Sequence, residues 1–241
     1  MSKSLDGANI LVPGGTGNVG EGVVRAALRA GANVIVPSGN AERLTELRGL
    51  IGSDDATNLY TKTLGYYDFD QATSMAESIT DEFGSIDHVV AIAGGWWNGK
   101  KVWDITQEDW QKAFVGPATT HMALLRALVP KLASNGSYTT IAGFLAHEAY
   151  PDSGIVSMQG AARLMMRRAL SVELKEVGLA KRANELMLGP VVNRSRPNGK
   201  DNWLTADQVG EVAVAVMSRN DITNQEVDIQ TTDRLARFLE G

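Results

Sequence analysis

A glycine-rich stretch near the amino end, "ILVPGGTGNVGEGVV" (10–24), most constrains what this chain can fold into. A short apolar run precedes it and a helical pattern follows it. Glycine permits a tight turn, the close approach of a ligand to backbone N–H groups, and close packing of the next helix. The spacing of Gly14, Gly17 and Gly20 therefore favours a turn that binds a dinucleotide diphosphate. The alternative is a tight strand-to-helix turn without a ligand.

The rest of the chain alternates apolar runs of strand length with helical patterns. Strands are predicted at 8–12, 33–38, 58–66, 86–94, 136–143, 182–189 and 226–230. Helices are predicted from about 18 and over 41–51, 71–84, 107–133, 153–177 and 205–218, with Ser153 as a cap. This alternation predicts one doubly wound α/β domain over 1–241, a Rossmann-type parallel sheet of about seven strands with helices on both faces. The polar loop 190–204 is expected to be a functional lid or disordered.

Composition excludes several classes of protein. A net charge of −5 argues against a nucleic-acid binder, and no stretch is apolar for long enough to cross a membrane. With no cysteine there is no disulfide framework, and no metal site is expected. The start lacks the pattern of a signal peptide, so the mature chain is expected to begin near Met1 and to be cytoplasmic. The cluster Arg163, Arg167 and Arg168 is interpreted as a solvated helix flank.

Four motifs resemble the short-chain dehydrogenase/reductase family. They are "GGTGNVG" (14–20), "YDFD" (67–70), "VAIAGG" (90–95) and "NELMLGPV" (184–191), and the resemblance extends over nearly the whole chain. The resemblance implies an oxidoreductase that binds NAD(P)(H) and a small-molecule substrate, as a homodimer or homotetramer. The cofactor-binding residues it implies, together with those of the glycine turn, are Gly14, Thr16, Gly17, Asn18, Val19, Gly20, Ser38, Asn40, Arg43, Asp68, Ala93, Gly94, Gly189 and Val191.

The end of the second strand determines the choice between the two nicotinamide cofactors. An NAD-selective site places a carboxylate there, and "VIVPSGN" has none. The nearby polar residues are Ser38, Asn40 and Arg43, and Arg43 is suited to a 2′-phosphate. NADP(H) is therefore favoured over NAD(H), although Arg43 also fits the role of an ordinary exposed helix residue without a ligand.

The catalytic tetrad of the family, an Asn, Ser, Tyr and Lys set, is absent. Aligning helix 153–177 by Arg168 and Glu173 places Val156 at the tyrosine and Gly160 at the lysine. The serine position falls on Gly143 or Ala142, and the asparagine position on Gly116 or Pro117. No Tyr-x-x-x-Lys occurs anywhere in the chain. Val156 and Gly160 are expected to leave the first turns of the helix apolar and roomy.

Other residues could still serve a reaction at the ligand-facing edge of the sheet. His147 and Tyr150 are weak substitutes for the missing acid. Trp96 and Trp97 suggest an aromatic wall for a substrate or, equally, a hydrophobic plug or an oligomer contact. These four residues form the predicted substrate pocket. His88 and His121 are interpreted as structural.

Three functional hypotheses follow. The first is an atypical oxidoreductase that reduces an activated small-molecule acceptor without the usual proton donor. The second is a non-catalytic sensor or scaffold that binds NADP(H). The third is a lyase, isomerase or cyclase that uses the pocket without hydride transfer.

Overall fold

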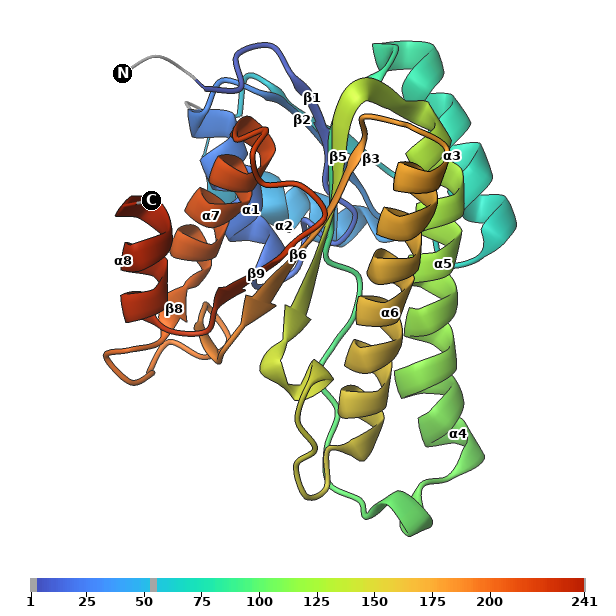
Figure 1. Ribbon diagram of the computed structural model, residues 1–241, viewed down its shortest axis with the longest axis vertical. Helices are drawn as coiled ribbons and strands as arrows, with labels where there is room; N and C mark the ends of the chain where they lie inside the picture. Colours follow the sequence, from blue (N-terminus) through green and yellow to red (C-terminus); the bar gives the residue numbers. More distant parts are fainter. Residues whose placement is uncertain (1–3, 53–55, 241) are drawn as a thin grey trace.

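The computed structural model describes residues 4–52 and 56–240, and it contains one seven-stranded sheet (Figure 1). Met1, where the mature chain was expected to begin, lies outside these residues. All strand pairs in the sheet are parallel, in the order β3-β2-β1-β4-β5-β6-β9. The strands are β1 (Asn9–Leu11), β2 (Asn33–Pro37), β3 (Leu59–Lys62), β4 (Ile86–Ala91), β5 (Leu132–Gly143), β6 (Arg182–Leu188) and β9 (Glu226–Ile229). The predicted fold class is confirmed.

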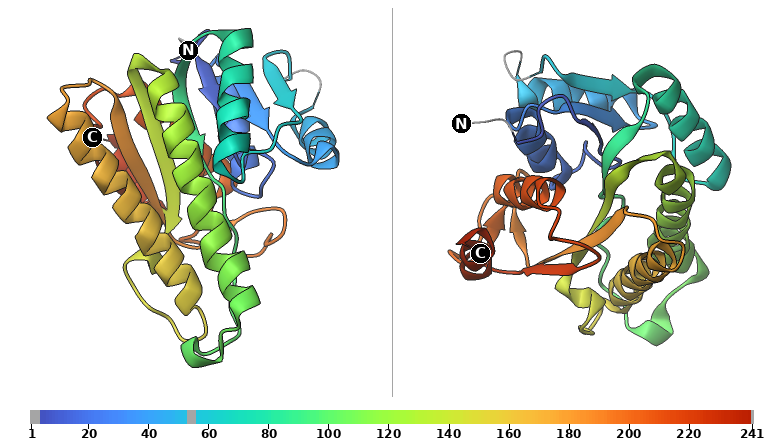
Figure 2. Two further views of the ribbon diagram at one scale, coloured as in Figure 1. Left: turned by 90° about the vertical axis from the view of Figure 1, so that its right-hand side faces the viewer. Right: turned by 45° about the horizontal axis from the view of Figure 1, so that its top comes forward.

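Helices cover both faces of the sheet. They are α1 (Gly20–Arg29), α2 (Ala41–Ile51), α3 (Phe69–Phe83), α4 (Gln107–Trp110), α5 (Gly116–Leu128), α6 (Gly154–Glu176), α7 (Ala206–Ser218) and α8 (Thr232–Glu240). Apolar residues of α1, α2 and α7 form one core with the sheet, and those of α3, α5 and α6 form another. Figure 2 shows α3, α5 and α6 side by side over their face.

The strand order reverses between β1 and β4, which lie next to each other in the sheet. In open α/β sheets, ligands bind outside the carboxyl ends of the strands at such a switch point. The glycine-rich turn follows β1 at this edge. The architecture therefore places the turn where a dinucleotide would cross the sheet.

Close packing of two helices fixes the start of α1. A Cβ atom on Gly22 would lie 2.0 Å from the carbonyl oxygen of Ala206, and one on Gly210 would lie 2.2 Å from that of Gly22. Both distances are far below van der Waals contact. Only glycine at these two positions allows α1 and α7 to approach this closely, so α7 supports the helix that begins at the turn.

The helix predicted over 107–133 is interrupted. It consists of α4, a π-helical stretch over Gln111–Val115, α5 and a short 3₁₀ turn over Val129–Lys131. Pro117 has no N–H to donate to the carbonyl of Ala113, which explains why the regular hydrogen-bond ladder breaks there. Pro130 sits in the closing 3₁₀ turn, and β5 begins at Leu132, earlier than predicted.

Smaller differences concern the ends of elements. The strands predicted to reach 66 and 94 end at Lys62 and Ala91. Ser153 precedes α6, but its side chain makes no capping hydrogen bond, so the predicted cap is wrong. Helix α8 was not predicted, nor was the two-stranded pair β7 (Val191–Val192) and β8 (Leu204–Thr205) that frames the loop 190–204.

Candidate functional site

The glycine-rich turn has the shape of a phosphate cradle. Gly14 has φ +88, and a Cβ atom on it would lie 2.7 Å from the carbonyl carbon and oxygen of Ile92. A Cβ atom on Gly20 would lie 2.2 Å from the carbonyl oxygen of Gly14. No described side chain caps the amino end of α1, which begins after Val19. The N–H groups of Glu21 and Gly22 donate to the carbonyls of Gly17 and Val19. The N–H of Gly20 and the helix dipole remain for an anion, and these residues fit a dinucleotide diphosphate.

The predicted adenosine side lies at the ends of β2 and β3. The buried Ser38 accepts a hydrogen bond from the N–H of Asn40 at 3.1 Å, and Asn40 caps α2 by accepting from the N–H of Arg43 at 3.0 Å. Arg43 is exposed, as is Asp68, which caps α3 by accepting from the N–H of Gln71 at 2.8 Å. The elements thus bring Ser38, Asn40, Arg43 and Asp68 to one edge.

Tyr66 is an aromatic contact at this edge that the sequence did not indicate. It is buried, and its ring centroid lies 4.9 Å from that of Tyr67. Burial raises the pKa of Tyr66 to about 12, and the nearby charge of Tyr67 adds to the shift, against a backbone hydrogen bond from Gly14. The neutral phenol therefore contacts the glycine-rich turn at Gly14. It takes no part in proton exchange near neutral pH.

A second segment lies against the glycine-rich turn. Ser195 accepts a hydrogen bond from the side-chain amide of Asn18 at 2.8 Å. Arg194 forms ion pairs with Glu21, at 2.8 Å, and with Glu46. These contacts join the loop 190–204 to residues 16–21, so the segment predicted as a lid or a disordered loop is ordered over the candidate phosphate site.

The predicted nicotinamide side lies on the segments that follow β4 and β6. The N–H of Ile92 donates to the carbonyl of Pro13 at 2.8 Å, which joins the segment Ala93–Gly94 to the glycine-rich turn. Gly189 is packed so closely that a Cβ atom would lie 2.2 Å from the carbonyl oxygen of Gln230. Val191 is buried in β7. The four residues predicted here therefore lie on segments that border the crevice.

The space beside Gly160, the predicted position of the family's lysine, is filled. A Cβ atom on Gly160 would lie 3.0 Å from the Cβ and 3.1 Å from the Cα of Ala146, in a short turn after β5. The expectation that Gly160 leaves room in the first turns of α6 is therefore wrong, because the backbone of Ala146 occupies that room. Gly143 has open space at its Cβ position, and Val156 is half-buried.

The proposed substitute acids lie on the loop between β5 and α6. His147 Nε2 lies 2.6 Å from Oε1 of Glu226 at the start of β9. The ring of Tyr150 contacts Phe144 edge-on, with ring centroids 5.9 Å apart, and 54% of Tyr150 is exposed. His147 is thus engaged with a carboxylate, whereas the hydroxyl-bearing Tyr150 is accessible.

The segment after β4 reaches across to the start of α6. The N–H of Gly99 donates to the carbonyl of Asp152 at 2.9 Å, and Lys101 pairs with the Asp152 carboxylate at 3.0 Å. Within this segment Trp96 is 62% exposed and Trp97 is half-buried. The two tryptophans therefore lie on the segment 95–101, at the carboxyl edge of the sheet, where they were predicted.

A groove of about 420 Å³ follows the segment 95–101. It is lined by Val102, Ile105, Thr106, Gln107, Trp110 and Met158, from α4, the segment before it and the start of α6. None of the four residues predicted as the substrate pocket lines it. The structure thus separates this mostly apolar groove from Trp96, Trp97, His147 and Tyr150.

A buried polar cluster lies between α5, α6 and the sheet. Arg163 and Arg167 of α6 are 8% and 6% exposed, so their interpretation as a solvated flank is wrong; Arg168 alone is on the surface. The Nε of Arg163 lies 3.6 Å from Oε1 of Glu185, which is fully buried on β6. Burial raises the pKa of Glu185, and the charges of Arg163 and Arg167 oppose that shift.

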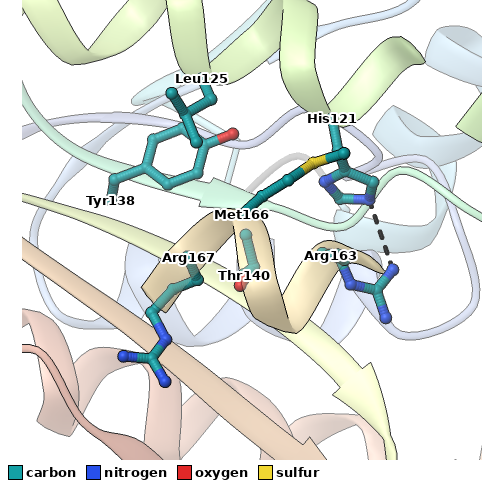
Figure 3. Close-up of a pocket in the computed structure, with 7 residues that line it drawn as sticks. All are labelled: His121, Leu125, Tyr138, Thr140, Arg163, Met166 and Arg167. Carbon is teal, nitrogen blue, oxygen red and sulfur yellow. Dashed lines mark hydrogen bonds between the residues drawn. The ribbon is translucent and has the colours of Figure 1, made fainter. Parts of the chain in front are cut away.

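A cavity of about 10 Å³ adjoins this cluster (Figure 3). It is lined by His121, Leu125, Tyr138, Thr140, Arg163, Met166 and Arg167. The hydroxyls of Tyr138 and Thr140 have no hydrogen-bond partner among the described residues. A cavity of this volume has room for about one water molecule.

Sequence reasoning missed this cluster because its members come from three separate elements. Arginine at a spacing of four residues is typical of an exposed helix face, and only the buried Glu185 shows otherwise. The available signal was "NELML": a glutamate in the middle of an apolar parallel strand needs a charged or hydrogen-bonding partner.

Two further features are absent from the described part of the chain. No group of three His, Cys, Asp or Glu side chains there is arranged to hold a metal ion. None of the described helices combines the length and apolar character needed to cross a bilayer.

Known proteins resemble this chain in both sequence and structure. Residues 15–227 match the family described as enoyl-(acyl carrier protein) reductase. The short chain dehydrogenase/reductase dpchG of Colletotrichum higginsianum is 32% identical over 173 residues, which cover 65% of this chain and 63% of that relative. The match therefore spans less than two thirds of the relative's length.

Solved structures share the fold at lower identity. A short chain dehydrogenase from Salmonella enterica serovar Typhi has a TM-score of 0.85 at 20% identity, covering 95% of this chain and 98% of that one. A short chain oxidoreductase from Pseudomonas aeruginosa PAO1, described as containing an atypical catalytic center, has a TM-score of 0.80 at 17% identity, covering 92% and 95%. With the family match over most of its length, this chain belongs to the short-chain dehydrogenase/reductase family.

Proposed function

We propose that this protein is an NADP(H)-binding oxidoreductase that reduces an activated small-molecule acceptor without the proton-donating tetrad of its family. The observation that carries the proposal is the pairing of an intact glycine cradle with a filled lysine site. Gly14 and Gly20 keep the shape that a diphosphate needs, whereas Gly160 packs against Ala146. The shape needed to bind a dinucleotide is thus present, whereas the space that the usual lysine needs is not.

The class of acceptor follows from the missing acid. The bound dinucleotide would supply hydride, and a plain ketone would then need a proton at its oxygen as negative charge develops. A quinone or an iminium ion needs less acid assistance, because its product anion is delocalised or its product is neutral. The proton would come from solvent, from the substrate or from Tyr150 or His147, of which the exposed Tyr150 is the more accessible.

The preference for NADP(H) is supported by the end of β2. Arg43 is exposed in the first turn of α2, and Ser38 and Asn40 are the other polar side chains there. No carboxylate follows β2 at the position where an NAD-selective site places one. A 2′-phosphate there would therefore meet the guanidinium group of Arg43.

A homodimer or homotetramer is also proposed. Met158, Met165 and Val172 are exposed on α6 at intervals of seven residues, so they form one apolar stripe along the helix. Exposed Met122 lies on the adjacent α5. A second copy of the chain is the proposed cover for this stripe, because the helix pair presents a surface long enough to match itself across a two-fold axis.

Steady-state turnover with NADPH tests the proposed reaction. Quinone and iminium acceptors are expected to be reduced about tenfold or more faster than plain ketones, since only the ketones lack the acid assistance they require. Tyr150→Phe and His147→Ala identify any protein acid, and unchanged turnover in both variants would remove these two residues. Binding of NADPH without turnover across the whole panel would contradict the oxidoreductase and favour the sensor or scaffold.

A further inference from the structure

The guanidinium group of Arg163 lies directly beneath the carboxyl edge of the sheet. Arg163 is on α6, three residues after Gly160, and therefore on nearly the same face of the helix. A Cβ atom on Gly94 would lie 3.7 Å from Nη1 of Arg163. Gly94 itself is exposed, just beyond the end of β4. A buried cation thus supports backbone that faces the dinucleotide crevice.

His121 lies between the same guanidinium and the neighbouring carbonyl group. Its Nε2 donates a hydrogen bond to the carbonyl oxygen of Ala93 at 2.5 Å. The Nη1 of Arg163 lies 3.3 Å from the same ring nitrogen (Figure 3). Burial, and then the charge of Arg163, lower the pKa of His121 to about 3. The imidazole is therefore neutral near neutral pH, and it adds no charge of its own to this contact.

Positive charge is in excess in the cluster. Three guanidinium groups, Arg163, Arg167 and Arg168, face two carboxyl groups, the buried Glu185 and the partly exposed Glu226. Burial lowers the pKa of Arg163, but a guanidinium group stays protonated in proteins. The cluster therefore carries at least one uncompensated positive charge whether Glu185 is ionised or protonated. In an interior of low dielectric constant, such a charge acts over a longer distance than it would in water.

The two redox forms of the cofactor differ in the charge of the nicotinamide ring. The oxidised nicotinamide ring carries a positive charge that the reduced ring lacks. A dinucleotide held by the turn after β1 extends across the switch point toward the ends of β4 and β5. Its nicotinamide half would then lie near Ala93 and Gly94, on the side of the crevice that Arg163 supports.

We infer that Arg163 is a positioning residue of the dinucleotide site whose buried positive charge favours the reduced over the oxidised dinucleotide. It acts through His121 and the Ala93–Gly94 backbone, from one turn beyond the position where the family's lysine is missing. This inference rests on the proposed binding of NADP(H), and it goes beyond that proposal by naming the residue that selects the redox form.

Calorimetric titration with NADP⁺ and NADPH separates this role from a structural one. The measured quantity is the ratio of the two dissociation constants, Kd for NADP⁺ over Kd for NADPH. Arg163→Gln is expected to lower the ratio about sixfold, as for one unit charge roughly 15 Å away at an effective dielectric constant of about 20. Arg163→Lys keeps the charge and is expected to keep the ratio within about twofold of the original.

Two more variants complete the design. Arg182→Met removes a buried arginine at the amino end of β6, about 20 Å from its carboxyl end, and is expected to leave the ratio unchanged. Should Arg163→Gln not fold, Arg167→Gln removes the second guanidinium of the cluster and is expected to lower the ratio in the same direction.

The contrary outcomes are distinct from one another. An unchanged ratio in Arg163→Gln, or an equal change in the Gln and Lys variants, would overturn the role of Arg163 while leaving dinucleotide binding intact. Failure of the unmodified protein to bind either nucleotide would overturn both this inference and the proposed function.

Discussion

Gly160 shows how a single residue changes the chemistry that a helix can offer. Three atoms of Ala146 lie 3.0–3.3 Å from where its Cβ would stand, so a longer side chain could enter only if the turn Phe144–Ala146 moved. Placing a tyrosine at Val156 and a lysine at Gly160 would therefore not by itself create the family's tetrad. One turn further along α6 lies the buried Arg163, which sequence spacing alone assigns to the surface.

His88 gives a pH dependence that belongs to one residue. Burial lowers its pKa to about 4, and the charge of Arg182 adds to the shift while Asp87 opposes it. Because the pKa in the folded state lies below the ordinary 6.5, His88 favours folding fully above pH 6.5. That contribution is lost as the pH falls toward 4, and it amounts to about 3 kcal/mol.

Urea unfolding at several pH values checks this prediction. His88→Asn is expected to reduce the slope of the free energy of unfolding against pH between 6.5 and 4, because the asparagine does not titrate. Ser137 lies 2.8 Å from Nδ1 of His88 through its Oγ, so Ser137→Ala removes that partner without removing the titrating group. Ser137→Ala should change the free energy of unfolding by the same amount at every pH, and it should leave the slope of that free energy against pH unchanged. Equal slopes in the original protein and His88→Asn would refute the assignment.

At the scale of elements, periodicity identifies which segments are helices and strands, whereas their ends depend on particular residues. Apolar alternation correctly predicts all seven strands of the main sheet. It does not show that Pro117 interrupts the helix predicted over 107–133, nor that Asp68 starts α3 two residues earlier than expected. Helix α8 was missed because a short amphipathic terminal segment resembles an exposed tail.

The apolar stripe of α6 gives a prediction about assembly. Met165→Glu is expected to shift the mass measured by multi-angle light scattering toward the monomer, because it places a charge in the proposed contact. Leu239→Glu, an equally exposed apolar residue on α8, is the matched control and should leave the mass unchanged. A monomeric mass for the unmodified protein would remove the proposed homo-oligomer.

At the scale of the whole molecule, the sequence predicts the fold better than the site. The alternation of strands and helices predicts a doubly wound parallel sheet. The glycine-rich turn predicts where a dinucleotide would cross that sheet. The buried cluster around Glu185 depends on contacts between α5, α6 and β6, which are distant in the sequence. The ordering of the loop 190–204 by Arg194 and Ser195 likewise depends on residues near the opposite end of the chain.

The central claim is that the turn at Gly14 binds a nicotinamide dinucleotide, and calorimetric titration with NADPH, NADH and their oxidised forms tests it most directly. The account predicts one site per chain and tighter binding of NADPH than of NADH. Gly14→Ala should weaken binding tenfold or more, about 1.4 kcal/mol, because its Cβ would strike Ile92. Gly49→Ala, on the exposed face of α2 with open space around it, should not. Absence of binding by all four nucleotides would contradict the account.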